Sequence, residues 1–166
     1  MSKNKEEKTN VMRILDREKI PYTPHFYQEG GGPEGTREYG LHVAQALGEN
    51  PDRVFKTLAA RGASGEIYVF AIPAAGTLDL KKAARAVEEK SVQMLRVDEI
   101  NAATGYIRGG CSPVGMKKRY RTVFHRTAED FKSIYISAGK IGAQVEADPK
   151  ALLRLLQAEA ADIAAV

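Results

Sequence analysis

The chain has 166 residues, of which 43% are hydrophobic and 28% are charged, and its formal net charge is +4 at neutral pH. This length and apolar content provide the core of one ordinary domain, so we expect a single domain. One cysteine excludes an intramolecular disulfide, and the sequence shows neither a signal-peptide pattern nor an apolar run of membrane-spanning length. We therefore expect a soluble cytoplasmic protein without a membrane partner.

The first half of the chain predicts two helices, a short strand and a hairpin. Val11, Ile14 and Leu15 are spaced as on one face of a helix that follows a polar cap at Thr9. The other elements expected here are a flexible tail at residues 1–8, a strand at 25–27, a glycine-rich loop at 29–38, a helix at 40–48 and a hairpin of residues 54–62 and 66–73.

The second half mixes an amphipathic helix at residues 79–90 with short strands. Strand patterns occur at residues 91–97, 121–126, 133–139 and 143–147, with an irregular link at 98–105 and a last helix at 149–164. Strands and helices do not alternate strictly. We therefore predict one α+β domain over residues 9–166, with a mixed, strongly curved, barrel-like sheet surrounded by helices.

Several short patterns suggest chemistry, and each is weak by itself. Residues 30–36 have the glycine spacing of a phosphate loop but lack its lysine, which argues against nucleotide hydrolysis. Ser137 and Lys140 match the S-x-x-K pattern of serine amidases, although so short a pattern recurs by chance. Cys111 is a candidate nucleophile, but a lone cysteine is more often a buried structural residue. The scattered histidines form no ligand spacing, so we predict no metal and no cofactor.

A basic run follows the glycine-rich stretch GGCSPVG of residues 109–115. It contains Lys117, Lys118, Arg119 and Arg121. Backbone amides of glycine loops can bind an oxyanion or a carbonyl oxygen, and neighbouring cations can hold a phosphate backbone. We therefore predict that these four cations contact nucleic acid, with an ordinary solvated surface as the alternative.

Four motifs in register resemble those of the YbaK-type aminoacyl-tRNA deacylases, relatives of the editing domain of bacterial prolyl-tRNA synthetases. They are VFKTL at residues 54–58, AGTLDLKKAA at 75–84, TGYIRGGCSPVGMKKR at 104–119 and IYISAGKIG at 134–142. The resemblance implies the fold of that editing domain and a trans-editing enzyme that protects translation by removing mischarged cysteine from tRNA(Pro). It also implies an aminoacyl-tRNA partner and allows a partnership with prolyl-tRNA synthetase.

The resemblance further implies roles for individual residues. Lys56 would contact the terminal ribose or phosphate, and backbone amides of Gly109 and Gly110 would approach the ester carbonyl. The substrate's own thiol would attack that carbonyl and form a thiolactone, so the protein would supply positioning and no nucleophile. Gln144 stands where the family often has an aspartate, a departure that bears on amino-acid preference. The substrate pocket would also include Tyr27, Thr57, Ser112 and Gly139.

Three alternatives stay open at this point. The same fold could remove another small amino acid, such as alanine from tRNA(Pro), with water in place of the substrate thiol. The protein could bind tRNA or a synthetase without catalysis. It could also act as a serine amidase through Ser137 and Lys140.

Overall fold

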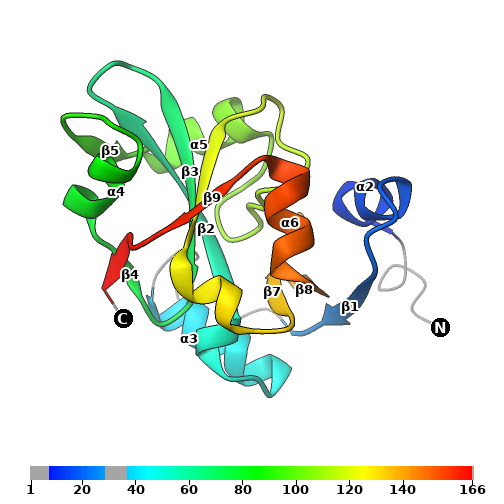
Figure 1. Cartoon of the computed structure of the whole chain (residues 1–166). Helices are drawn as coiled ribbons and strands as arrows, with labels where there is room; N and C mark the ends of the chain where they lie inside the picture. Colours follow the sequence, from blue (N-terminus) through cyan, green and yellow to red (C-terminus); the bar gives the residue numbers. More distant parts are fainter. Residues whose placement is uncertain (1–7, 29–36, 166) are drawn as a thin grey trace.

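The computed structural model describes residues 8–28 and 37–165, which form three β-sheets and the helices packed on them (Figure 1). Residues 1–7 of the predicted tail and residues 29–36 of the predicted glycine-rich loop lie outside the described residues. The helices are α2 (Asn10–Arg17), α3 (Arg37–Leu47), α4 (Leu80–Ala86), α5 (Val97–Thr104) and α6 (Pro149–Leu156), with 3₁₀ helices η1 (Pro51–Arg53) and η2 (Arg126–Asp130). The strands are β1 (Tyr22–Phe26), β2 (Phe55–Gly62), β3 (Ile67–Pro73), β4 (Thr77–Leu78), β5 (Val92–Met94), β6 (Arg121–His125), β7 (Ile134–Ser137), β8 (Ala143–Ala147), β9 (Glu159–Ala161) and β10 (Ala164–Ala165).

The largest sheet has five strands in the order β5-β2-β3-β6-β9 and mixes both pairing directions. β2 is antiparallel to β3 and to β5, whereas β6 is parallel to β3 and to β9. The second sheet, β1-β8-β7, is antiparallel, and β10 pairs with β4. The predicted α+β class and mixed sheet are confirmed. The described strands form three open sheets, however, and the single barrel-like sheet that we predicted is not found among them.

Alternation of side chains along β3 places a separate core on each face of the large sheet. Phe70 and Ile72 pack with α4 and the C-terminal segment, whereas Ala71 faces a core shared with α2, α6 and the three-stranded sheet. A third, smaller core lies against α3 and includes Val54 and Tyr135. Residues 54–62 contribute to all three cores, so β2 is held from several sides.

Polar side chains start three helices at the positions that the sequence predicts. Thr9, Asp79 and Asp148 each accept a hydrogen bond from a backbone N–H two or three residues later, at 3.3, 3.0 and 2.9 Å. Such caps satisfy amides that have no partner inside the helix. None of the described helices is long and apolar enough to cross a bilayer.

Two predicted elements are wrong. The link expected at residues 98–105 is mostly helix α5, because Glu99 accepts a hydrogen bond from the N–H of Arg96 at 2.9 Å and Gly105, at φ 85°, ends the helix. This helix also shortens the strand predicted at 91–97 to Val92–Met94. The last helix ends at residue 156, because residues 159–161 pair with β6 and this long-range pairing overrides the helix propensity of an alanine-rich segment.

Candidate functional site

A pocket of ≈ 480 Å³ opens beside the first half of β2. A parallel bridge between Val54 and Tyr135 brings β7 to the start of β2, and β5 pairs with β2 only from Ala60 to Gly62. Residues at the ends of β7 and β5 line the pocket, which therefore lies in the interval between these two neighbours of β2. Its size falls within the range of about 300–1,000 Å³ that small-molecule sites occupy.

Lys56 is the second residue of β2 and lines this pocket, with its side chain partly buried. β2 pairs with β3 from Phe55 to Arg61, and Lys56 lies opposite Ile72, so the hairpin holds the lysine backbone. Phe55 and Leu58 contribute apolar wall to the same pocket. A cation between apolar walls interacts strongly with an anionic or polar ligand group, because the local dielectric constant is low.

The two glycine turns predicted from the sequence pack against each other. Gly109 lines the pocket and has φ 88°, a left-handed conformation that favours glycine. A Cβ added at Gly110 would lie 3.1 Å from the Cα of Lys140, closer than most such contacts in proteins, so glycine favours this close approach of the two turns. The N–H of Gly110 donates to the carbonyl of Ile107 at 3.0 Å, so the amide role predicted for Gly110 does not fit this geometry.

Two buried oxygens in the pocket have no hydrogen-bond partner among the described residues. They are Oγ1 of Thr57 and Oε1 of Gln144, and both residues line the pocket. Buried polar atoms are normally paired, so these two oxygens in the pocket are suited to hydrogen bonds with a bound ligand or water. Thr57, which the sequence analysis placed in the substrate pocket, lines this pocket.

Three other predicted pocket residues lie outside the lining. Ser112 is fully buried, and its hydroxyl accepts from the N–H of Val114 at 3.3 Å. Gly139, at φ 99°, borders Tyr106 under α2. Tyr27 packs on the small core beneath α3, and its hydroxyl is buried without a partner among the described residues. The pocket therefore collects Lys56, Thr57 and Gly109 of the predicted residues.

Neither candidate nucleophile in the lining is activated. Burial raises the pKa of the Cys111 thiol to about 11, so this thiol is protonated at neutral pH. The hydroxyl of Ser137 donates to the carbonyl of Gly110 at 3.1 Å and accepts from the N–H of Gly139 at 3.0 Å, while Lys140 is exposed. Ser137 thus braces the glycine turns. Within the described ranges, no cluster of His, Cys, Asp or Glu side chains could hold a metal ion.

The fold divides the predicted basic cluster. Lys117, Lys118 and Arg119 are exposed, and Nζ of Lys117 donates to a carbonyl near the end of α5 at 3.3 Å. Arg121 instead forms a two-point ion pair with Glu159, with distances of 2.8 and 3.2 Å. This carboxylate neutralises much of the Arg121 charge, so the three preceding cations are the better phosphate ligands.

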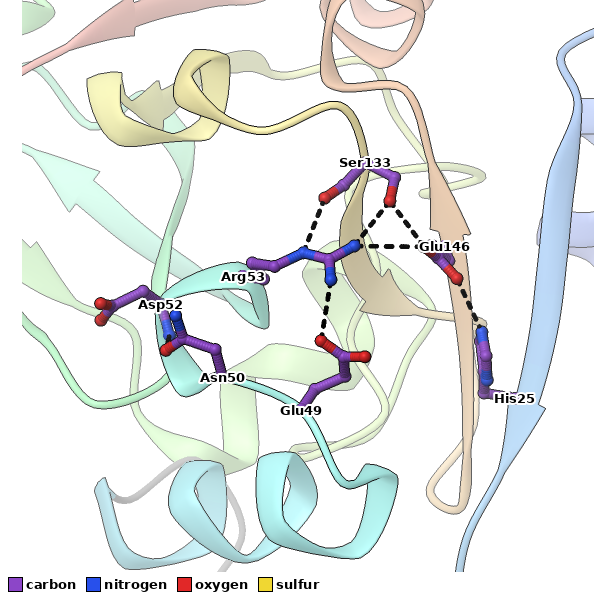
Figure 2. Close-up of polar contacts among 7 residues, drawn as sticks. All are labelled: His25, Glu49, Asn50, Asp52, Arg53, Ser133 and Glu146. Carbon is purple, nitrogen blue, oxygen red and sulfur yellow. Dashed lines mark hydrogen bonds and ion pairs between the residues drawn. The ribbon is translucent and has the colours of Figure 1, made fainter.

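A polar network missed by the sequence analysis joins η1 to the three-stranded sheet (Figure 2). Arg53 donates through Nε and Nη2 to the carbonyl and hydroxyl oxygens of Ser133, at 3.2 and 2.7 Å. Its Nη2 also contacts Glu146 at 3.2 Å, and its Nη1 contacts Glu49 at 2.9 Å. The only sequence signal is the i,i+4 spacing of Glu49 and Arg53, since Ser133 and Glu146 are distant in the chain.

This network supports the wall of the pocket. Arg53 immediately precedes Val54, which bridges to Tyr135, and its guanidinium lies 5.3 Å from the centroid of the Tyr135 ring. Hydrogen bonds from Ser133 first, and then from His25, hold the pKa of Glu146 below its usual range. A fixed carboxylate and guanidinium therefore anchor the chain three residues before Lys56.

Comparison with known proteins identifies the family of this chain. The family model described as the aminoacyl-tRNA editing domain matches residues 36–155. The chain belongs to this family. EbsC of Enterococcus faecalis, which is named as a candidate Cys-tRNA(Pro)/Cys-tRNA(Cys) deacylase, is 40% identical over 164 residues that cover 98% of each protein.

Two solved structures share the fold of this editing domain. The hypothetical protein APE2540 superposes with a TM-score of 0.83 at 24% identity, covering 95% of this chain and all (100%) of that one. A candidate trans-editing enzyme for prolyl-tRNA synthetase superposes with a TM-score of 0.76 at 24% identity, covering 96% and 100% of the two chains. The family predicted from the four motifs is confirmed, and all four motifs lie within the matched residues of the editing domain.

Proposed function

We propose that this editing domain is a trans-editing deacylase that removes cysteine from tRNA(Pro). The observation that carries the proposal is a pocket that combines the Lys56 ammonium group with the Gly109 turn but, among its described lining, contains no activated nucleophile. Such a site can position an ester and stabilise developing negative charge, which suffices when the substrate supplies the attacking group. The 40% identical relative is named for the same reaction.

In the proposed reaction the substrate's cysteine thiolate forms a bond to its own carbonyl carbon. The ester C–O bond breaks, and the 3′-oxygen of the terminal ribose takes up a proton. The products are a four-membered thiolactone and deacylated tRNA. A free thiol has a pKa near 8.5, so a fraction is ionised at neutral pH, whereas the buried Cys111 thiol is not.

Different residues of the pocket would bind different parts of the substrate. The Lys56 ammonium group would hold the terminal ribose or phosphate, and the N–H of Gly109 would approach the ester carbonyl. The acceptor oxygens of Thr57 and Gln144 suit the protonated amino group of the aminoacyl moiety, because they lack donors in the described structure. Gln144 is neutral, so this pocket would hold the ammonium group without a full ion pair.

The proposal is tested by measuring deacylation of Cys-tRNA(Pro), of the same substrate with its thiol alkylated, and of Ala-tRNA(Pro). We expect turnover of the first substrate alone, and we expect Lys56→Ala to lower kcat/KM by about 100-fold or more, the usual effect of removing one electrostatic contact in an active site. Lys132→Ala, at an exposed lysine before β7, is the matched control and should leave the rate unchanged.

The other outcomes would identify the alternatives. Turnover of the alkylated substrate or of Ala-tRNA(Pro) would indicate attack by water. Binding of tRNA without any turnover would indicate an adaptor, and full activity of Lys56→Ala would remove the lysine from the mechanism. Adding prolyl-tRNA synthetase to the assay tests the proposed partnership, which predicts a higher rate in its presence.

A further inference from the structure

Apolar side chains gather around the mouth of the pocket. Four large hydrophobic residues are exposed in the described part of the chain, namely Leu80 (43%), Met94 (39%), Val97 (59%) and Ile107 (57%). Leu80, Met94 and Val97 also line the pocket, whereas Ile107 does not. We call these three the apolar rim. Exposed apolar groups that gather at one concave site, unlike scattered ones, mark a binding surface.

Helix α5 connects this rim with the basic run. Val97 opens the helix at the pocket, and Lys117 donates to a carbonyl near its other end at 3.3 Å. From Val97 to Thr104 the helix rises about 10 Å at 1.5 Å per residue, which matches the rise of about three stacked nucleotides at 3.4 Å each. A single strand lying along α5 would thus reach from the rim to the cations.

The charges along helix α5 distinguish an end that suits a base from an end that suits phosphates. The first turn of α5 carries Asp98 and Glu99, which pair with Arg96 and Arg61 at 3.1 Å each. The arginines beside the first turn of α5 are thus paired with carboxylates, and the exposed side chains of the rim are apolar, which suits a base better than a phosphate. The exposed Lys117 and Lys118 at the other end favour phosphates.

We propose that the apolar rim packs against the terminal adenine base of an aminoacyl-tRNA, while Lys117 and Lys118 contact phosphates of the preceding nucleotides. This inference rests on the proposed function, which seats the terminal ester in the adjoining pocket. Flat bases bind by stacking on apolar and aromatic side chains. Three side chains form too small a patch for a stable protein interface, which buries about 800 Å² per partner, so a base fits the rim better than a protein.

The binding probe is an RNA minihelix that ends in single-stranded CCA, compared with the same minihelix whose final residue is abasic. We expect the wild-type protein to bind the CCA form more tightly, and the double variant Met94→Ser/Val97→Ser to weaken that binding by about 5- to 10-fold. The abasic form should bind the wild type and the double variant equally. Ile107→Ser is the matched control, because it removes an equally exposed hydrophobic side chain outside the pocket.

The salt dependence of binding distinguishes the contribution of the apolar rim from that of the lysines. The double variant should keep the wild-type slope of log Kd against log salt, whereas Lys117→Glu should reduce that slope. Equal affinities of the double variant and Ile107→Ser for the CCA minihelix would overturn the inference. So would a double variant that binds the minihelix normally but loses binding to prolyl-tRNA synthetase, since the rim would then contact a protein.

Two results distinguish failure of the deacylase proposal from failure of the base-site inference. If the wild type deacylates no aminoacyl-tRNA but still prefers the CCA minihelix in a rim-dependent way, the base site stands and the deacylase proposal falls. If Cys-tRNA(Pro) is deacylated with the same KM by the wild type and by the double variant, the deacylase proposal stands and the base site falls. Circular dichroism spectra that match the wild type would verify that the serine variants are folded.

Discussion

Arg53→Ala removes a guanidinium that lies between two carboxylates, one in the link between α3 and η1 and the other on β8. In the folded protein this group contacts Glu49 at 2.9 Å and Glu146 at 3.2 Å, and it donates two further hydrogen bonds to Ser133 (Figure 2). The side-chain exposures of the two carboxylates are only 25% and 24%. After the substitution, both carboxylates lie in a largely buried site without their shared cation.

The size of the effect follows from this burial. Removing one partner of a buried ion pair costs about 3–5 kcal/mol, because the other charge stays buried, whereas an exposed pair contributes about 0–1 kcal/mol. Since a quarter of each side chain is in solvent and Ser133 and His25 still bind Glu146, we expect about 3 kcal/mol. In a domain of this length 1 kcal/mol shifts Tm by about 2–4 °C, so Tm should fall by about 6–12 °C.

Thermal denaturation at pH 7, followed by circular dichroism, measures this difference. Arg61→Ala is the matched control, because Arg61 also belongs to the β2 region but its exposed guanidinium, 43% accessible, pairs with Glu99 at the surface. We expect the control to lose less than about 4 °C. A Tm loss for Arg53→Ala no larger than that of Arg61→Ala would refute the reasoning, because the network would then contribute no more than a surface pair.

Three further predictions concern acid stability, thiol reactivity and tRNA binding. The hydrogen bond from Ser133 lowers the pKa of Glu146 in the folded protein, so the ionised carboxylate stabilises the fold above the usual glutamate pKa, and this contribution is lost as pH falls through the folded pKa. In acid denaturation, the wild type should therefore be more stable than Ser133→Ala near neutral pH, and this difference in stability should vanish at low pH. Cys111 should resist a thiol reagent at pH 7 in the folded protein and react fully in denaturant; equal rates would contradict its burial. Lys117→Glu/Lys118→Glu should weaken tRNA binding and flatten its salt dependence, and an unchanged slope would leave both lysines as solvated surface.

Local signals in the sequence were sufficient for most of the secondary structure. Caps such as Asp79 and Asp148 act within a few residues and correctly predict where their helices begin, and the continuous apolar run of residues 67–73 correctly predicts a strand. Helix α5 carried the same kind of signal in Glu99 and Gly105, so it could have been predicted. The end of the last helix could not, because strand pairing with β6 decides it from a distance.

The sequence by itself also determined the family and pointed to Lys56, since the four motifs follow one another in the family's order and all lie within the matched residues. Only the tertiary structure decided which of the predicted residues share a pocket: it places Lys56, Thr57 and Gly109 there, with Gln144, and leaves Gly139 against α2. The physical reason is that a pocket is made by contacts between strands and turns distant in the chain, which no local pattern records. The network of Arg53 could not be predicted for the same reason, because Ser133 and Glu146 come close to Arg53 only when the three-stranded sheet packs against η1.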